Sequence, residues 1–321
     1  MKRQFVKDLK VGVLVNDIFL CTRRDVKERR DGGQFLTLEL KDRTGTINAI
    51  IWERIEDALA CVETGGFYHV QGRVGDYQGN PQLNISLIWP ADKSELSRDD
   101  FLTASRFDPK EMLAELRNYI AEVKNPNLLQ LLTAFFDDTR FVERFSMAPG
   151  GAQVHHDYLS GLLEHTLFMC RLARSVAATY PEIDRDLLMT GVILHDVGKI
   201  KEYCYDVAID HTLDGRLIGH IVLGYEMVKE KIAASKDFPE ELARMLLHII
   251  LSHHGHLEFG SPKTPKFVEA FIVYALDNLD SRVMMFREVV EKHPGIKWTD
   301  FHQYLETNVY IKDQPGAGQC R

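Results

Sequence analysis

The chain has 321 residues, enough for two domains of ordinary size, and its 45% hydrophobic and 27% charged residues exclude a largely disordered protein. Its net charge of −8 argues against a uniformly basic nucleic-acid-binding protein. The charge is uneven, because residues 1–90 carry 13 Lys and Arg against 12 Asp and Glu, whereas residues 91–321 carry 26 against 35. An acidic half that also holds most of the histidines suits a site for divalent cations.

Cysteine usage and hydropathy exclude two further classes of protein. The five cysteines are an odd number and form no CxxC pair, so neither a disulfide framework nor a zinc knuckle is predicted. No window reaches the ~18 consecutive apolar residues of a membrane-spanning helix. The apolar run at residues 11–21 is broken by Asn16 and Asp17, which does not fit a signal peptide. We therefore expect a soluble, cytoplasmic protein without a membrane partner.

The first 90 residues have the composition and turn spacing of β-strands. Short β-rich runs bounded by turn signals predict strands at residues 11–20, 34–41, 46–52, 67–74 and 82–88. The apolar stretch at residues 55–62, between the third and fourth strands, predicts a helix. Five strands with a helix after the third is the order of an OB-fold barrel.

One segment strengthens this prediction. The run LTLELKDRTGTINAIIW at residues 36–52, followed by GRV at 72–74 and YQG at 77–79, resembles the nucleic-acid-binding OB domains. Such a domain implies aromatic rings that stack on bases and basic groups that pair with phosphates. The candidates are Phe35, Trp52, Tyr68 and Tyr77, with Arg73 for phosphate, and some of the aromatic residues must instead belong to the core.

A charged segment at residues 23–31 is expected to be the first loop between strands. It carries five positive and three negative charges and includes Arg23 and Arg24. The first loop of an OB-fold often touches the bound strand. A merely solvated loop is equally consistent with the sequence, because the acidic residues offset most of the positive charge.

Residues 91–107 are polar without a clear period and are expected to be a linker. From Asp108-Pro109 onward the period becomes helical, since Asp caps helices and Pro favours their first position. Further helices are predicted near residues 126–136, 158–179, 185–195, 216–233, 239–252, 265–290 and 299–307. The fold class is therefore multi-domain: an all-β OB-fold barrel at residues 1–90, an all-α domain at residues 108–313, and a flexible tail at residues 314–321.

Histidines and aspartates lie on the apolar faces or at the ends of these helices. They form the ordered set His165, His195-Asp196, His220, His253-His254 and Asp277. Inward-facing polar side chains need partners, and one bound divalent cation satisfies several at once. Imidazole and carboxylate ligands suit manganese, iron, cobalt, magnesium or zinc. A single His-Asp pair or a single inward histidine would be weak evidence, but the complete set is hard to obtain by chance.

The set resembles the HD superfamily of metal-dependent phosphohydrolases. The resemblance implies that His165, His195, Asp196 and Asp277 hold one metal. It implies that His220 and His253 hold a second, with His254 as a further candidate ligand and Asp196 as the bridge. Two adjacent metals lower the pKa of a bridging water and neutralise phosphate oxygens, as phosphodiester hydrolysis requires.

Lys199 follows Asp196 by three residues. It is a candidate catalytic residue, with Asp196, because its ammonium could contact a phosphate oxygen or assist the leaving group. The competing interpretation is an ordinary solvated charge at a helix end.

A closer resemblance rests on the segment HHDYLSGLLEHT at residues 155–166 and GRLIGH at 215–220. Together with the OB domain, these segments look like the YhaM-type 3′→5′ exoribonucleases. The resemblance implies a manganese-dependent enzyme that trims single-stranded RNA from the 3′ end, with single-stranded DNA as a second candidate substrate. Ser160 departs from the glycine expected there. His156 and Tyr158 become candidate contacts to the nucleotide, or alternatively residues that cap and pack the start of the helix.

Two other functions stay open. The first is an HD-type phosphohydrolase of nucleotides or cyclic dinucleotides, since a fold does not decide a function. An OB barrel argues against it, because a free nucleotide needs no domain that holds a strand. The second is a nucleic-acid-binding regulator with a relic HD domain, against which the complete ligand set argues. The sequence does not decide whether the protein forms a homo-oligomer.

Overall fold

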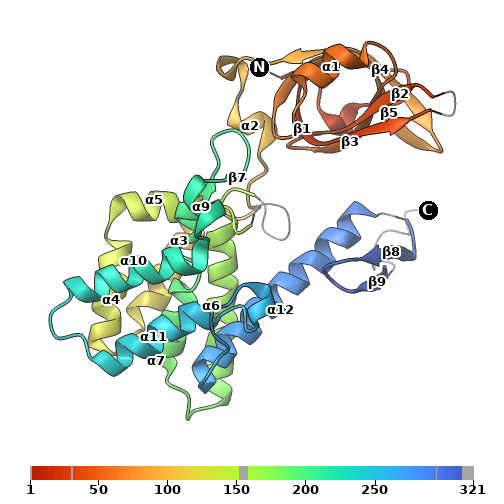
Figure 1. Ribbon diagram of the computed structural model, residues 1–321. Helices are drawn as coiled ribbons and strands as arrows, with labels where there is room; N and C mark the ends of the chain where they lie inside the picture. The colour runs from red at the N-terminus through yellow and green to blue at the C-terminus, as the bar shows by residue number, and fades with distance from the viewer. Residues whose placement is uncertain (1, 30–31, 152–157, 294, 313–321) are drawn as a thin grey trace. The chain divides into compact units, whose positions relative to one another are not determined.

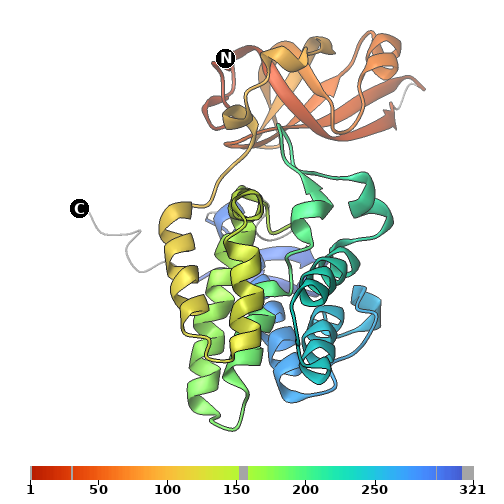
Figure 2. The same ribbon diagram turned by 90° about the vertical axis from the view of Figure 1, so that its left-hand side faces the viewer.

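The computed structural model describes residues 2–29, 32–151, 158–293 and 295–312. It divides into two compact units (Figures 1 and 2). The first unit contains the residues up to Thr103 together with the segment Tyr205–Ile209, and the second contains the rest of the chain. Among the described residues, no helix is both long enough and apolar enough to cross a membrane.

The first unit is a closed five-stranded barrel with the strand order β1-β2-β3-β5-β4 (Figure 1). Its elements are β1 (Leu14–Glu28), β2 (Gln34–Asp42), β3 (Gly45–Ile51), α1 (Ile55–Cys61), β4 (Phe67–Tyr77) and β5 (Asn80–Pro90). β3 and β5 pair in parallel, and the other neighbouring strands pair antiparallel. The predicted OB-fold is therefore confirmed.

Alternate side chains of the strands fill the barrel. Leu36, Leu38 and Leu40 of β2 point inward and are buried, as the two-residue period of a strand requires. Lys2 is buried against the barrel core, with its Nζ 3.3 Å from the ring centroid of buried Phe19. The same ammonium is 3.4 Å from a carboxylate oxygen of Asp42, so the buried positive charge is paired.

Two details of the first unit differ from the sequence-based expectation. β1 continues to Glu28, which pairs with Gln34, so most of the segment expected to be a loop is strand. The expected linker at residues 91–107 contains the short helices η2 (Lys93–Glu95) and α2 (Arg98–Phe101). Phe101 is buried, and its ring packs edge-on against that of Phe67 with the ring centroids 4.8 Å apart.

The second unit is helical. Its helices are α3 (Pro109–Ala121), α4 (Pro126–Phe136), α5 (Thr139–Met147), α6 (Gly161–Thr179), α7 (Arg185–Leu194), α8 (Lys199–Glu202), α9 (Leu213–Leu217), α10 (His220–Ala234), α11 (Glu240–Ser252) and α12 (Val268–Lys292). Side chains that accept backbone N–H bonds fix several helix starts: Asp108, Asn125, Asp138 and Asp184.

Two helices lie at the centre of this unit. α6 packs against α3, α5, α7 and α12, and α7 packs against α4, α6, α11 and α12 (Figures 1 and 2). Both helices are therefore covered on several sides, and residues such as Leu162 and Leu187 are fully buried. Polar residues on these two helices must find their partners inside the unit.

Four features of the helical half differ from the sequence-based expectation. The helix expected at residues 216–233 is two helices, α9 and α10, because Gly219 adopts φ +80° between them. The helix expected at residues 299–307 is wrong: the segment forms a hairpin of β8 (Trp298–His302) and β9 (Thr307–Tyr310). The segment is rich in β-forming residues. Leu305 and Val309 of this hairpin pack against α12. α5 was missed, and a short pair, β6 (Tyr203–Cys204) and β7 (Asp210–His211), interrupts the all-α domain.

Candidate metal centre

The two central helices position the first histidines of the predicted set. His165 lies in α6 among fully buried residues of the same face, Leu162 and Met169. His195 is the C-cap of α7 and is itself fully buried. Since buried imidazoles require polar partners, these side chains must be satisfied from neighbouring elements.

The first ligand group consists of His165, His195 and Asp277, whose ligand atoms all lie within 4.8 Å of one another. His165 Nε2 is 3.3 Å from His195 Nε2 and 3.4 Å from Asp277 Oδ1. Asp277 comes from α12, which packs against both α6 and α7. The packing of three helices thus brings these three side chains together.

The second ligand group consists of His220, His253 and His254, whose ligand atoms also lie within 4.8 Å of one another. His220 begins α10, and the other two histidines directly follow α11. Gly198 allows α10 to approach the His195-Asp196 turn, because a Cβ at this position would lie 2.0 Å from the carbonyl oxygen of His220.

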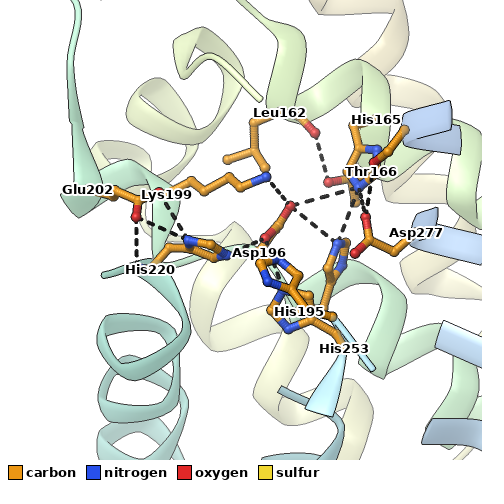
Figure 3. Close-up of polar contacts among 12 residues, drawn as sticks. Leu162, His165, Thr166, His195, Asp196, Lys199, Glu202, His220, His253 and Asp277 are labelled. Carbon is orange, nitrogen blue, oxygen red and sulfur yellow. Dashed lines mark hydrogen bonds and ion pairs between the residues drawn. The ribbon is translucent and has the colours of Figure 1, made fainter. Parts of the chain in front are cut away.

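Asp196 lies between the two ligand groups (Figure 3). Its Oδ2 is 3.3 Å from His195 Nε2 in the first group. Its Oδ1 is 3.5 Å from His220 Nε2 and 3.5 Å from His253 Nε2 in the second. One carboxylate therefore presents a different oxygen to each group, the geometry that a ligand shared by two adjacent cations needs.

The five histidines are all oriented through Nδ1. The partners are Asp280 Oδ2 for His165 (2.7 Å), Val192 O for His195 (2.7 Å), Glu202 Oε1 for His220 (3.1 Å), Ile250 O for His253 (2.7 Å) and Phe259 O for His254 (2.9 Å). Carbonyl and carboxylate oxygens accept, so each Nδ1 carries a proton that it donates. Each Nε2 is thereby left to face the ligand groups, as in metal-binding histidines.

The centre also contains polar atoms that the protein does not satisfy. Within the described residues, His220 Nε2, His253 Nε2 and Asp196 Oδ1 are buried and have no hydrogen-bond partner. Leaving such atoms unpaired is costly. Divalent cations bound by imidazole nitrogen and carboxylate oxygen would satisfy all three, so the residues present fit a metal centre.

Asp280 and Glu202 were not predicted as site residues. Asp280 follows Asp277 by three residues, and this spacing places both on one face of α12. Glu202 ends the short helix that begins at Lys199. The sequence shows an acidic residue at this position, six residues after Asp196. What was not readable is that both carboxylates are buried beside histidines.

Burial and charge together set the protonation of the centre. Burial by itself would lower the pKa of His165, but the hydrogen bonds with Asp277 and Asp280 raise it to about 10, so a cation that binds Nε2 must displace a proton from it. Burial would raise the pKa of Asp196, but the charges of Lys199 and His195 hold it well below its usual range. The carboxylates of the centre are thus ionised, as cation ligands must be.

Lys199 is buried, and its Nζ is 2.7 Å from Asp196 Oδ2 (Figure 3). The interpretation of Lys199 as a solvated charge at a helix end is therefore wrong. Although burial would lower the pKa of its ammonium, the negative charges of Asp196 and Asp277 raise it. Lys199 therefore stays positively charged within reach of any anion that approaches Asp196.

Replacing Asp280 with asparagine is expected to weaken metal binding about 10- to 100-fold, the usual cost of losing the partner that orients a ligating histidine. An amide can accept the Nδ1–H bond of His165 but lacks the carboxylate charge. The measurement is titration of the purified protein with Mn²⁺ by calorimetry. Glu288→Gln, at a partly exposed site of the same helix, is the control and should bind like the unchanged protein. Equal affinity for Asp280→Asn would contradict the assignment.

The candidate nucleic-acid contacts on the barrel are only partly accessible. Trp52 and Tyr77 are exposed, and Phe35 stacks on Trp52 with ring centroids 4.9 Å apart. Arg73 is also exposed. Tyr68 is a correction: it is buried in the barrel core and its hydroxyl accepts from the backbone N–H of Glu63, so no base can stack on it.

The two arginines of the expected first loop lie in β1 instead. Arg23 is exposed and forms an ion pair with Asp25 at 2.7 Å. Arg24 donates to the carbonyl oxygen of Leu59 at the end of α1, which ties it to the barrel. Only Arg23 therefore has a side chain directed to solvent.

The residues before α6 lie partly outside the described residues, and His156 is one of those. Tyr158 is half-buried, and burial together with the negative charge of Glu164 raises the pKa of its hydroxyl. Ser160 adopts φ +66°, a left-handed conformation that favours glycine. Glycine would adopt this conformation without strain, and Ser160 adopts it in this chain.

Comparison with known proteins matches both halves of the chain. The HD domain family matches residues 162–282, and the OB-fold nucleic acid binding domain family matches residues 22–91. Proteins named 3′-5′ exoribonuclease YhaM from Bacillus velezensis and Bacillus subtilis are each 36% identical over 94% of this chain and 96% of their own length. The protein of that name from Listeria monocytogenes is 38% identical over 90% of this chain and 92% of its own. The chain therefore belongs to the family of the YhaM 3′-5′ exoribonucleases.

Proposed function

We propose that this protein is a metal-dependent exonuclease that removes nucleotides from the 3′ end of single-stranded RNA. The observation that carries the proposal is the position of Asp196, with one carboxylate oxygen facing each of two ligand groups. Membership of the YhaM family supports the substrate and the direction of cleavage.

The roles of the individual residues follow from this proposal. His165, His195 and Asp277 hold one divalent cation, and His220, His253 and His254 hold the other, with Asp196 shared. Bound cations supply an activated water and neutralise charge on the phosphate. Lys199, held beside Asp196, stabilises negative charge that develops on the phosphate oxygens or the leaving group. Manganese is the proposed metal, and iron, cobalt, magnesium and zinc also accept such ligands.

The barrel, residues 1–90, is proposed to hold the RNA strand, and residues 108–313 to cut it. Exposed Trp52, stacked on Phe35, offers a ring for bases, with Tyr77 as a second and Arg73 and Arg23 for phosphates. Because stacking and phosphate pairing do not require the 2′-hydroxyl, single-stranded DNA is a second proposed substrate. We also propose a cytoplasmic location, where RNA turnover takes place.

A substrate panel tests the proposal. Purified protein with Mn²⁺ is incubated with single-stranded RNA, single-stranded DNA, a cyclic dinucleotide and mononucleotides, and the products are separated by chromatography. We expect mononucleotides to be released from RNA and the small substrates to stay intact. Hydrolysis of the cyclic dinucleotide with RNA untouched would favour a nucleotide phosphohydrolase. Binding of RNA without hydrolysis of any substrate would favour a regulator.

A further inference from the structure

Three rings gather beside the second ligand group: those of His256, Phe259 and Tyr274, here called the aromatic rim. The centroid of the His256 ring lies 5.5 Å from that of Phe259 and 5.6 Å from that of Tyr274. His256 Nε2 and the Tyr274 hydroxyl are 3.2 Å apart, within hydrogen-bond distance. The aromatic rim is therefore a connected cluster and not three isolated side chains.

The aromatic rim is attached to a proposed metal ligand. The carbonyl oxygen of Phe259 accepts the Nδ1–H bond of His254, and the backbone N–H of His254 donates to Ser261 Oγ at 3.1 Å. Backbone bonds from Phe259 N and Ser261 N to the His256 carbonyl oxygen close the loop on itself. The backbone of Phe259, from which its ring extends, is thus held at a fixed place relative to the second ligand group.

Tyr274 links the aromatic rim to the first ligand group. It lies three residues before Asp277 on α12, so the two side chains share one face of the helix. Its ring also covers Gly255, where a Cβ would lie 2.3 Å from the ring, directly after the second ligand group. The side chains of Asp277 and His220 are 14% and 13% exposed while those of His195 and His253 are fully buried, so solvent reaches both ligand groups.

Two large apolar residues of this loop are exposed to solvent. Phe259 is 61% exposed and Leu257, two residues before it, is 66% exposed, so neither stabilises the core of the unit. An exposed apolar surface beside a reactive centre is typical of a site that binds a partner or ligand. Flat aromatic rings at such a place suit a nucleobase, because every base has a π-face that stacks on them.

We infer that the aromatic rim holds the base of the 3′-terminal nucleotide while the two ligand groups hold the adjacent phosphodiester. The inference rests on the proposed function. Stacking tolerates every sequence, which an enzyme that removes one nucleotide after another requires. The aromatic rim thus positions the terminal nucleotide without selecting its base.

The test compares two RNAs of identical sequence, one of which lacks only the base of its 3′-terminal nucleotide. Both carry a label at the 5′ end, and the kcat/KM for the first cleavage is measured with saturating Mn²⁺. The variants are Phe259→Ala and Phe259→Trp. The control is Tyr304→Ala, which removes an exposed aromatic ring from the turn between β8 and β9. The bound metal of each protein is measured, because Phe259 also holds His254 through its backbone.

We expect the unchanged protein and Tyr304→Ala to remove the intact nucleotide about tenfold more efficiently than the abasic one, the scale of a single stacked base. Phe259→Ala should lose this preference by slowing only on intact RNA, and Phe259→Trp should keep it. Equal rates on both RNAs with the unchanged protein would overturn the inference. The inference would also be overturned if Phe259→Ala lowered kcat/KM equally on both RNAs, whether or not the variant had lost metal. Absence of cleavage of either RNA by the unchanged protein would count against the proposed function itself.

Discussion

Replacing Asp196 with asparagine is expected to abolish hydrolysis, with a fall in kcat of about 10³-fold or more. The carboxylate is the only side chain among the described residues whose two oxygens face both ligand groups. Metal centres of this kind contribute several kcal/mol of transition-state stabilisation, and each 1.36 kcal/mol corresponds to about tenfold in rate. The amide keeps the shape of the side chain but removes the shared negative charge.

The measurement is the rate of nucleotide release from RNA, with RNA affinity and bound metal determined on the same preparations. RNA affinity should stay close to normal, because the proposed strand-holding residues belong to the barrel. Asp137→Asn, an identical change at an exposed position after α4, is the control and should be fully active. A rate within tenfold of normal for Asp196→Asn would contradict its central role.

Removing divalent metal is expected to lower the melting temperature of the helical unit by about 10 °C. Metal at 1,000 times its dissociation constant stabilises a folded state by about 4 kcal/mol. For a unit of this size, a change of 1 kcal/mol in the free energy of unfolding shifts the melting temperature by about 2–4 °C. The physical reason is the set of buried atoms on His220, His253 and Asp196 that have no hydrogen-bond partner among the described residues and that bound cations would satisfy.

Scanning calorimetry with Mn²⁺ and with EDTA measures this difference. The barrel provides an internal control, because none of the ligand-group residues belongs to it and its own transition should not move. The double variant His220→Ala, His253→Ala should show a much smaller difference between the two conditions. A helical unit that melts at the same temperature with and without metal would show that the centre binds none.

The barrel could be predicted from the sequence because its signals are local. The two-residue period of β2 at Leu36, Leu38 and Leu40 marks a strand with one buried face. The end of β1 could not be predicted in this way, since the charged residues 23–28 lack that period and are held by pairing with β2. Tyr68 was misassigned for a related reason: the residue type suits both a core and a binding surface, and only the fold decides.

The helical half shows the same limit at its edges. Helices with apolar stripes, such as α3 and α4, begin at Pro109 and Pro126 as predicted, and the structure shows that Asp108 and Asn125 cap them. The hairpin of β8 and β9 was read as a helix because it is short and its packing on α12 is a tertiary contact.

The candidate ligands were found because each is a histidine or aspartate on a buried face, and the structure brings all seven together. Their orienting partners were not found. Val192, Ile250 and Phe259 act through backbone carbonyl oxygens, which carry no signal in a side-chain pattern. Asp280 and Glu202 are ordinary acidic residues until burial beside a histidine distinguishes them. The aromatic rim likewise depends on a loop and a helix that only the fold places side by side.

The most direct test of the central claim is a denaturing gel of single-stranded RNA labelled at its 5′ end and incubated with the purified protein and Mn²⁺. One further lane contains EDTA and another contains the Asp196→Asn variant. We predict a ladder that shortens from the 3′ end with the unchanged protein and intact RNA in the other two lanes. Intact RNA in every lane, or a ladder that persists with Asp196→Asn, would contradict the account of a metal-dependent exonuclease centred on Asp196.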